Sequence, residues 1–136
     1  MVKANWEKLN LPKQRTAEFS YSAPYAARVH EGFTLKSGGD APARPWIALT
    51  VEQYEFLTEL RSRVGELIKT MPLDKALTQA FDELAENFGA AMQQNIQDPI
   101  WAWPRKTKRQ SGETVSSPRN IVDLGTLLKS YSLEIR

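Results

Sequence analysis

The side chains that most often carry catalysis or bind metals are scarce in this chain. Its 136 residues contain a single histidine, His30, and no cysteine. A Ser–His–acid triad would have to use His30, and no G-x-S-x-G turn presents a serine to it. A zinc site would need three carboxylates beside that histidine, because no second histidine stands at a zinc-binding spacing. We therefore expect a protein that is not an enzyme, with no catalytic residue, cofactor or metal.

Carboxylates and glycines offer no stronger chemical motif. Asp82, Glu83 and Glu86 lie close together in the sequence. A solvated helix face explains this group of carboxylates, and acid–base catalysis is the alternative. Gly38 and Gly39 form neither G-x-x-x-x-G-K-[ST] nor G-x-G-x-x-G, so no phosphate-binding loop is indicated.

Residues 99–118 combine tryptophans with a basic run and are expected to form an extended loop. Trp101 and Trp103 flank an alanine, so in extended backbone both side chains point the same way. We expect one to pack on its own domain and the other to contact a neighbouring subunit. The same combination suits base stacking and phosphate contact, so a nucleic-acid-binding module is the alternative function. The basic residues of this candidate interface are Arg105, Lys106, Lys108 and Arg109.

Charge is unevenly distributed, although the net charge is only +2. Residues 1–50 carry seven Lys/Arg against four Asp/Glu, and residues 51–99 carry four against nine. Residues 100–136 carry seven against three. An acidic middle between basic ends suits head-to-tail contact between copies of one subunit. A solvated acidic helix beside two basic loops would produce the same pattern.

The length and the 41% hydrophobic content suit a single domain over residues 1–136, with an N-terminal arm over 1–18. Residues 1–10 contain no apolar stretch typical of a secretory signal. No apolar run approaches the roughly 20 residues that cross a bilayer. The absence of cysteine fits a reducing cytoplasm.

Helical periodicity is strongest between residues 73 and 97, where Leu77, Phe81, Leu84 and Phe88 are expected to be buried. A preceding helix is expected from Thr50, as N-cap of a capping box with Gln53, to about residue 68. Strands are expected near residues 18–23, 45–49 and 131–136, together with pieces of residues 25–35. The fold class is therefore α+β, a small antiparallel sheet packed against a hairpin of two long helices, with a long basic loop.

Two patches carry recognisable motifs. The first is YAARVHEGF at residues 25–33, followed by a variable loop and ARPWI at residues 43–47. The second is SPRNIVDLGTLLKS at residues 117–130. In the second patch Asp123 can accept the backbone N–H of Gly125 or Thr126, which would cap a short helix. The structural-motif residues are Tyr25, Glu31, Gly32, Arg44, Pro45, Trp46, Arg119, Asp123 and Gly125.

Together these patches resemble the small neck, or head–tail joining (tail-completion), proteins of tailed bacteriophages, a family named after the tenth gene product of a lambdoid phage. That family shows tyrosine–alanine, an acidic–glycine turn, Arg-Pro-aromatic, and an ending of arginine, an apolar pair, Asp-Thr-Gly, leucine and serine. Leu124 departs from this pattern, because the family usually has threonine there. The resemblance covers about residues 19–135.

The resemblance implies a structural virion protein without cofactors, located at the neck or tail top after synthesis in the bacterial host cytoplasm. It implies a ring of copies of the chain, expected to be a hexamer, that contacts portal-proximal connector and tail proteins and no membrane. Weak contact with genomic DNA is compatible with that place. Two alternatives stay open: the second patch either fixes a local turn or docks directly, and Trp46 belongs either to the core or to a contact.

Overall fold

The computed structural model describes residues 15–34, 40–103, 107–108, 114–115, 117–121 and 125–136. Its helices are α2 (Ala26–Glu31), α3 (Trp46–Gln53), α4 (Phe56–Leu67), α5 (Leu73–Gln97) and α6 (Thr126–Lys129). Its strands are β1 (Ala17–Tyr21), β2 (Phe33–Thr34), β3 (Asp40–Ala41), β4 (Thr107–Lys108), β5 (Thr114–Val115) and β6 (Tyr131–Ile135).

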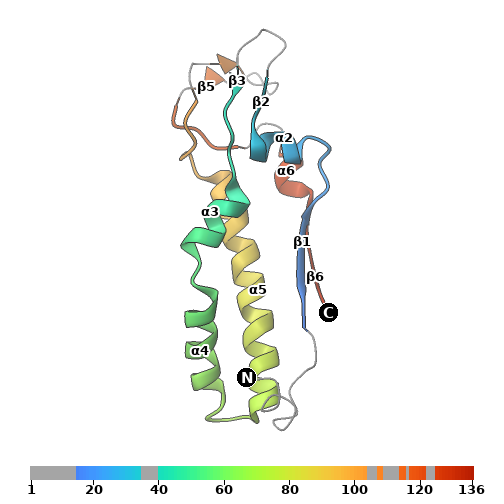
Figure 1. The fold of residues 1–136 in the computed structure, drawn as a ribbon, viewed down its shortest axis with the longest axis vertical. Coiled ribbons are helices and arrows are strands. Elements are labelled where there is room, and N and C mark those ends of the chain that lie inside the picture. The colour runs from blue at the N-terminus through green and yellow to red at the C-terminus, as the bar shows by residue number, and fades with distance from the viewer. Residues whose placement is uncertain (1–14, 35–39, 104–106, 109–113, 116, 122–124) are drawn as a thin grey trace, which may run out of the picture.

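The molecule is elongated, and the 25-residue helix α5 forms its spine (Figure 1). Helix α4 runs beside the lower half of α5 as an antiparallel hairpin, and α3 lies beside the upper half. Strands β1 and β6 lie along the other side of α5, while α2, β2, β3 and β5 gather at the upper end. The α+β architecture expected from the sequence, a small antiparallel sheet against a helical hairpin, is confirmed.

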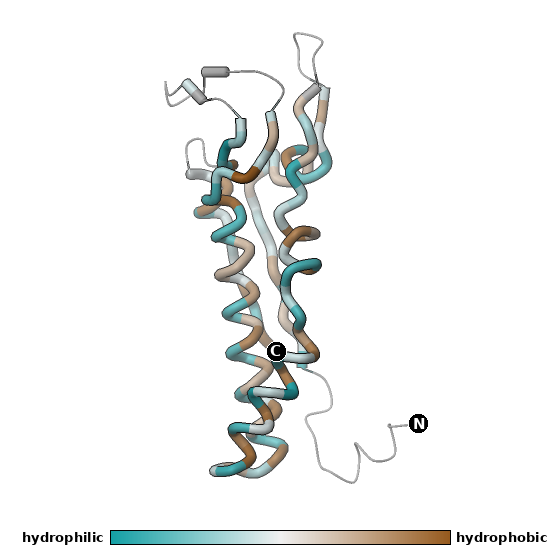
Figure 2. The backbone as a smooth tube through the Cα atoms, turned by 90° about the vertical axis from the view of Figure 1, so that its left-hand side faces the viewer, coloured by the Kyte–Doolittle hydropathy of each residue, from teal (hydrophilic) through white to brown (hydrophobic). Residues whose placement is uncertain are grey.

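Helix α5 begins and ends at prolines, as its sequence predicted. Pro72 stands at the N-cap, and Asp98, which precedes Pro99, is extended with ψ of 136°. Apolar residues alternate with polar ones along the helices (Figure 2). Small residues form much of the buried face of α5. Its buried residues are Ala76, Ala80, Leu84, Ala85, Gly89, Met92, Asn95 and Ile96.

Of the four α5 residues expected in the core, only Leu84 is fully buried, at 3% exposure. Leu77, Phe81 and Phe88 are only half-buried, so the expectation that they are buried was wrong for these three. The reason is the placement of the partners of α5. The α3–α4 segment and the β1–β6 sheet flank it without closing over Phe81 and Phe88, so an open space remains between them.

This difference predicts unequal costs for two truncations on α5. Leu84→Ala should lower the free energy of unfolding by about 2–5 kcal/mol, as for a fully buried leucine. Phe81→Ala should cost only about 1–2 kcal/mol, less than the 3–5 typical of a buried phenylalanine, since part of its ring faces solvent. Urea unfolding of both variants measures this. A larger loss for Phe81→Ala than for Leu84→Ala would contradict the described packing.

Residues 45–49 form helix and not the expected strand, because α3 starts at Trp46. The expected capping box at Thr50 is also absent, since Thr50 lies inside α3. Trp46 and Thr50 are one helical turn apart, and both are essentially fully buried. The Thr50 hydroxyl donates to the Trp46 carbonyl oxygen at 2.7 Å and accepts from Asn95 Nδ2 at 2.8 Å. Burial on one helical face therefore outweighs the strand-like composition of this short run.

The first long helix is also interrupted, where one continuous helix was expected up to about residue 68. The backbone is extended at Tyr54 (φ −101°, ψ 107°) and helix resumes at Phe56. This break directs the Tyr54 ring toward Phe88 and the Phe56 ring toward Phe81, with centroids 5.5 and 5.9 Å apart. No glycine or proline marks the break, so tertiary packing accounts for it.

The main sheet joins segments near the two ends of the chain. β1 and β6 pair antiparallel from Ala17 with Ile135 to Tyr21 with Tyr131, as expected for residues 18–23 and 131–136. The Tyr21 hydroxyl donates to Gln93 Oε1 at 2.8 Å, which ties β1 to α5. Two further two-stranded sheets, β2–β3 and β4–β5, are present in the described ranges. None of the described helices is both long and apolar enough to span a membrane.

The predicted loop over residues 99–118 contains local structure. Trp101 and Arg119 form an antiparallel bridge, with backbone N···O distances of 2.9 and 2.8 Å. Strands β4 and β5 pair as a short hairpin within the same segment. Of the expected N-terminal arm, residues 1–14 lie outside the described part of the chain, and residues 17 and 18 belong to β1.

Candidate functional site

The two sequence patches meet at the upper end of the molecule. The Arg44 backbone N–H donates to the Val29 carbonyl oxygen at 3.0 Å, and the His30 ring meets the Trp46 ring edge-on at 5.1 Å. Leu127, from the second patch, belongs to the same buried cluster as Val29 and Trp46. Most of the expected motif residues therefore build one local unit, although they lie far apart in the chain.

Two glycines of the patches have structural reasons to be glycine. Gly32 has a φ of +84°, and a Cβ there would lie 2.9 Å from the backbone nitrogen of Ala43. Gly125 has a φ of +76° and stands at the N-cap of α6. Positive φ is costly for residues with a side chain, so both positions favour glycine. Asp123, the predicted cap residue, lies outside the described residues.

The remaining motif residues divide into buried and exposed positions. Trp46, at 1% exposure, belongs to the core, which decides between the two alternatives left open for it. Pro45 is half-buried at the N-cap of α3. Tyr25 is 38% exposed at the N-cap of α2, and the exposed Glu31 carboxylate lies 2.7 Å from His30 Nδ1.

Trp101 packs inside its own subunit. It is 8% exposed, and its indole Nε1 donates to the Asn95 carbonyl oxygen at 2.7 Å. It belongs to the same buried cluster as Met92 and Ile96. A side chain held in this way offers little surface to another molecule, so Trp103 stays the candidate anchor of the pair.

The Trp103 ring contacts two guanidinium groups. Those of Arg44 and Arg119 stand 4.6 and 4.7 Å from its ring centroid, within the range of cation–π attraction. The Trp103 backbone N–H donates to Ser117 Oγ at 3.0 Å. We call Arg44, Trp103 and Arg119 the arginine–tryptophan cluster. It brings the first patch, the basic loop and the second patch together.

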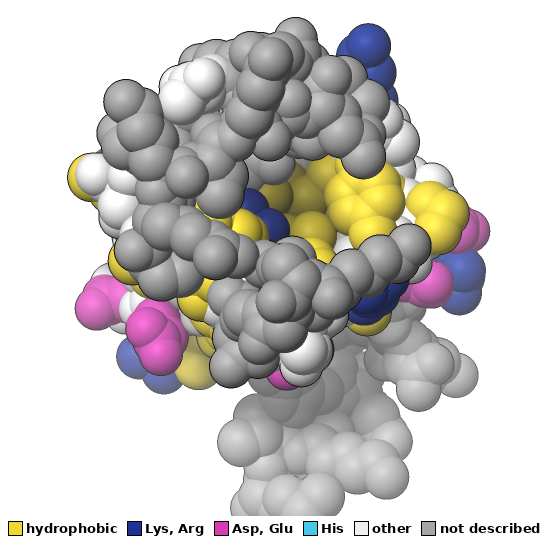
Figure 3. Space-filling model, turned by 90° about the horizontal axis from the view of Figure 1, so that it is seen from above, with side chains coloured by type: hydrophobic (Ala, Val, Ile, Leu, Met, Phe, Trp, Pro, Cys, Tyr) yellow, Lys and Arg dark blue, Asp and Glu magenta, His cyan; other side chains and the backbone are white. Residues whose placement is uncertain are grey.

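Seen from above, hydrophobic and basic side chains gather near the centre of the upper end (Figure 3). The basic residues of the expected interface are not among the side chains that the structure describes at this end. Arg105, Lys106 and Arg109 lie outside the described residues, and only the backbone of Lys108 is described, in β4.

Two of the four carboxylates of α5 form ion pairs. Asp82 accepts from Arg15 Nε at 2.6 Å, and Glu83 accepts from Arg63 Nε at 2.6 Å. The hydrogen bond from Arg63 lowers the pKa of Glu83. Glu86 is exposed on the same helix. Among the described residues, no three acidic or histidine side chains cluster as a metal site would require. These ion pairs favour a charged helix face over acid–base catalysis as the explanation for Asp82 and Glu83.

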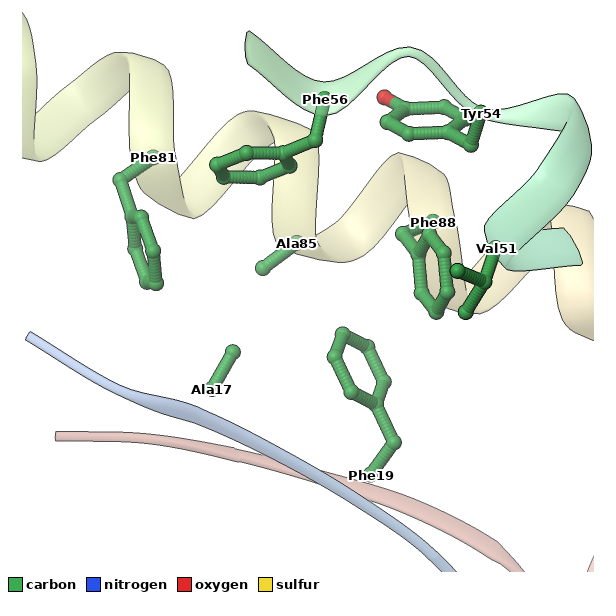
Figure 4. Close-up of a pocket in the computed structure, with 8 residues that line it drawn as sticks. All are labelled: Ala17, Phe19, Val51, Tyr54, Phe56, Phe81, Ala85 and Phe88. Atoms are coloured by element: carbon green, nitrogen blue, oxygen red, sulfur yellow. The ribbon is translucent and has the colours of Figure 1, made fainter. Parts of the chain in front are cut away.

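An open apolar groove, which the sequence analysis missed, lies between the sheet and the helices (Figure 4). It encloses about 340 Å³, and rings from its two walls point toward one another. Phe19 meets Phe88 across it, with centroids 5.1 Å apart. We call this space the aromatic groove. Its lining residues are Ala17, Phe19, Val51, Tyr54, Phe56, Phe81, Ala85 and Phe88.

A weak sequence signal for the aromatic groove existed in α5. Phe81 and Phe88 are two turns apart, and the small residue Ala85 lies between them on the same face. A small side chain between two large ones leaves a hollow unless a partner fills it. The aromatic residues Tyr54 and Phe56 gave no comparable signal, because their position depends on the break between α3 and α4.

Neither a protein-family model, a curated protein nor a solved structure matches this chain. The function of the chain is therefore inferred from its own surfaces. Apolar exposure continues beside the aromatic groove on α3 and α4, where Ile47, Val51 and Leu57 are 36%, 60% and 66% exposed. Exposed apolar side chains next to an apolar groove are typical of sites of association with other macromolecules.

Proposed function

We propose that the chain is a structural subunit that associates through apolar surface and assembles into a ring at the head–tail junction of a tailed bacteriophage. The observation that carries the self-association is the aromatic groove with the exposed apolar side chains beside it. The place in a virion rests on the resemblance of the two patches to neck proteins. Six copies are the expected number, and connector and tail proteins are the expected neighbours.

The arrangement of the patches supports a scaffold role. Their central residues, Val29, Trp46 and Leu127, are buried together, so they determine the shape of the upper end. Ring subunits need two different surfaces, because a heterologous interface joins unlike patches. The half-buried Arg44 and Trp103 at the upper end, and the α4–α5 hairpin below with six Asp/Glu against four Lys/Arg, are the candidates for two such surfaces.

The test uses a phage that encodes this chain. Inactivating its gene should leave separate heads and tails in the electron microscope, and supplying the parent chain should restore joined particles. Mass measurement of purified particles should find the chain in a ring-sized copy number. Normal particles that contain none of the chain would refute the proposal.

Trp103 provides a more specific prediction. Trp103→Ala should reduce the number of joined particles, because it removes the ring that both guanidinium groups contact. Trp103→Phe retains a ring face and should preserve more joining. Circular dichroism of both variants checks that they fold. Full joining by a folded Trp103→Ala variant would exclude this cluster from the interface.

The second candidate function is nucleic-acid binding, favoured by the arginine–tryptophan cluster beside the basic segment 105–109. We expect any DNA affinity to be weak and independent of sequence. With about four phosphate contacts, the association constant should fall about 100-fold between roughly 50 and 200 mM salt. Fluorescence anisotropy with labelled duplexes measures this. Tight binding to one sequence that salt does not weaken would favour the nucleic-acid-binding module instead.

A further inference from the structure

The aromatic groove has one unsatisfied polar group as well as apolar walls. The Tyr54 hydroxyl oxygen is buried and makes no hydrogen bond of regular geometry within the described residues, although Glu59 and Asn87 lie near enough to affect its pKa. Burial, and then the negative charge of Glu59, raises the pKa of Tyr54. A buried hydroxyl without a partner is unfavourable, and a ligand with a polar group at this point would relieve it. The groove therefore suits an apolar segment that also carries amide or backbone donors and acceptors.

The surroundings of the groove are acidic. Glu52, Glu55 and Glu59 lie on or beside the wall that Val51, Tyr54 and Phe56 form, and Glu86 follows Ala85 on α5. None of these four carboxylates makes an ion pair with a described residue. A partner of this surface should therefore be apolar and basic at once.

Residues 1–14 of the same chain have this composition. The segment MVKANWEKLNLPKQ contains the large apolar residues Trp6, Leu9 and Leu11. It carries three lysines against one glutamate, and its Asn and Gln side chains offer amide groups. Apolar content, opposite charge and hydrogen-bonding groups thus match the three properties of the groove.

The attachment point of this segment lies at one end of the groove. Along β1 toward the N-terminus, the chain passes from Phe19, which contacts Phe88, to Arg15, which pairs with Asp82. The Thr16 backbone is held to Arg136 by hydrogen bonds of 3.0 and 2.9 Å. At Arg15 the described chain therefore reaches the Phe81 end of the groove. To enter the groove of their own copy, residues 1–14 would have to reverse the direction of β1.

We propose that residues 1–14 of one copy bind the aromatic groove of a neighbouring copy. Each subunit would then give its arm on one side and receive an arm on the other, which is a heterologous contact of the kind that builds rings. This inference rests on the proposed self-association of the chain and is independent of its place in a virion.

The absence of native cysteine allows a direct test by disulfide formation. One full-length copy carries Leu9→Cys, and a second copy with a different tag carries Val51→Cys at the exposed edge of the groove. Mixing and mild oxidation should link the two copies at least about tenfold more than a mixture with Ile100→Cys, which is also exposed but outside the groove. The double variant Leu9→Cys/Val51→Cys is mixed with differently tagged parent chain. A disulfide within a single chain of this variant shows that the arm occupies the groove of its own copy.

A binding measurement removes any dependence on assembly. A labelled peptide of residues 1–14 should bind saturably to the chain that lacks these residues. Val51→Glu should weaken this binding at least about tenfold, because it removes an apolar contact and the bound arm would have to desolvate a carboxylate. The matched variant Ile100→Glu, at an exposed apolar position outside the groove, should change it less than about twofold.

Two outcomes would overturn the proposal. One is the absence of both peptide binding and cross-linking between copies. The other is a disulfide that forms only within single chains of the double variant, which assigns the groove to the chain's own arm. If arm and groove link different copies but phage particles lack the chain, the exchange stands and the virion function fails.

Discussion

Trp46→Ala is expected to lower the free energy of unfolding by about 3–5 kcal/mol. Trp46 is the largest of the fully buried side chains, and its ring meets Tyr21 and His30 edge-on at 5.3 and 5.1 Å. Alanine would leave a cavity that α3, α5 and β1 cannot all close, since each is fixed by other contacts. With total stabilities of about 5–15 kcal/mol, such a loss would unfold a large fraction of molecules on mild warming.

Urea unfolding followed by circular dichroism measures this effect. The matched control is Ile47→Ala on the same helix, where 36% exposure predicts a loss below about 1 kcal/mol. A loss for Trp46→Ala no greater than for Ile47→Ala would contradict the placement of Trp46 in the core.

Two glycine-to-alanine substitutions should change stability in opposite directions. Gly89 lies on α5 against β6, and a Cβ there would stand 1.8 Å from the Tyr131 hydroxyl oxygen and 2.9 Å from Cζ. Tyr131 would have to move away from the helix, although it also packs on Tyr21 with ring centroids 5.5 Å apart. We expect Gly89→Ala to destabilise the protein by about 1–3 kcal/mol, even though alanine favours helix.

Gly65→Ala is the control for helix propensity alone. Gly65 lies in α4, and a Cβ added there would meet no atom within 4 Å, so alanine should raise stability by up to about 1 kcal/mol. Thermal and urea unfolding of both variants give the comparison. If Gly89→Ala also stabilises the protein, β6 does not pack on α5 as described.

Some elements could be predicted from sequence because one local signal determined them. α5 has a long apolar period with a proline at each end, and its observed bounds agree with the prediction. Strands β1 and β6 alternate apolar and polar residues, and each has one face against α5. At Gly32 the backbone of Ala43 approaches closely and φ is positive, which explains the acidic–glycine turn of the first patch.

Other elements depend on contacts that the sequence does not display. The apolar run at residues 46–49 is compatible with either strand or helix, and the burial of Trp46 with Thr50 decides for helix. The break after Gln53 has no glycine or proline, because ring contacts with Phe81 and Phe88 cause it. The close approach of Tyr131 to Gly89 joins segments about 40 residues apart, so it too had no local signal.

The candidate site was predictable only in part. Sequence reasoning selected Trp101 and Trp103 as a pair and expected one of them to pack on its own domain. Their surroundings separate them, since Trp101 finds a carbonyl partner on Asn95 while Trp103 contacts Arg44 and Arg119. The aromatic groove escaped prediction because it is an incomplete core, formed by residues that each resemble ordinary core residues.

The pairing of β1 with β6 also governs the order in which the chain can fold. Ser20 and Ser132 hydrogen-bond at 2.6 Å across a separation of 112 residues. Closing so long a loop is slow, and during synthesis it must wait until β6 has left the ribosome, whereas the α4–α5 hairpin can form earlier from local contacts. Before β6 arrives, β1 has no strand partner and Phe19 lacks its fixed position against Phe88. The β1 wall of the aromatic groove is therefore among the last parts of the described fold to form.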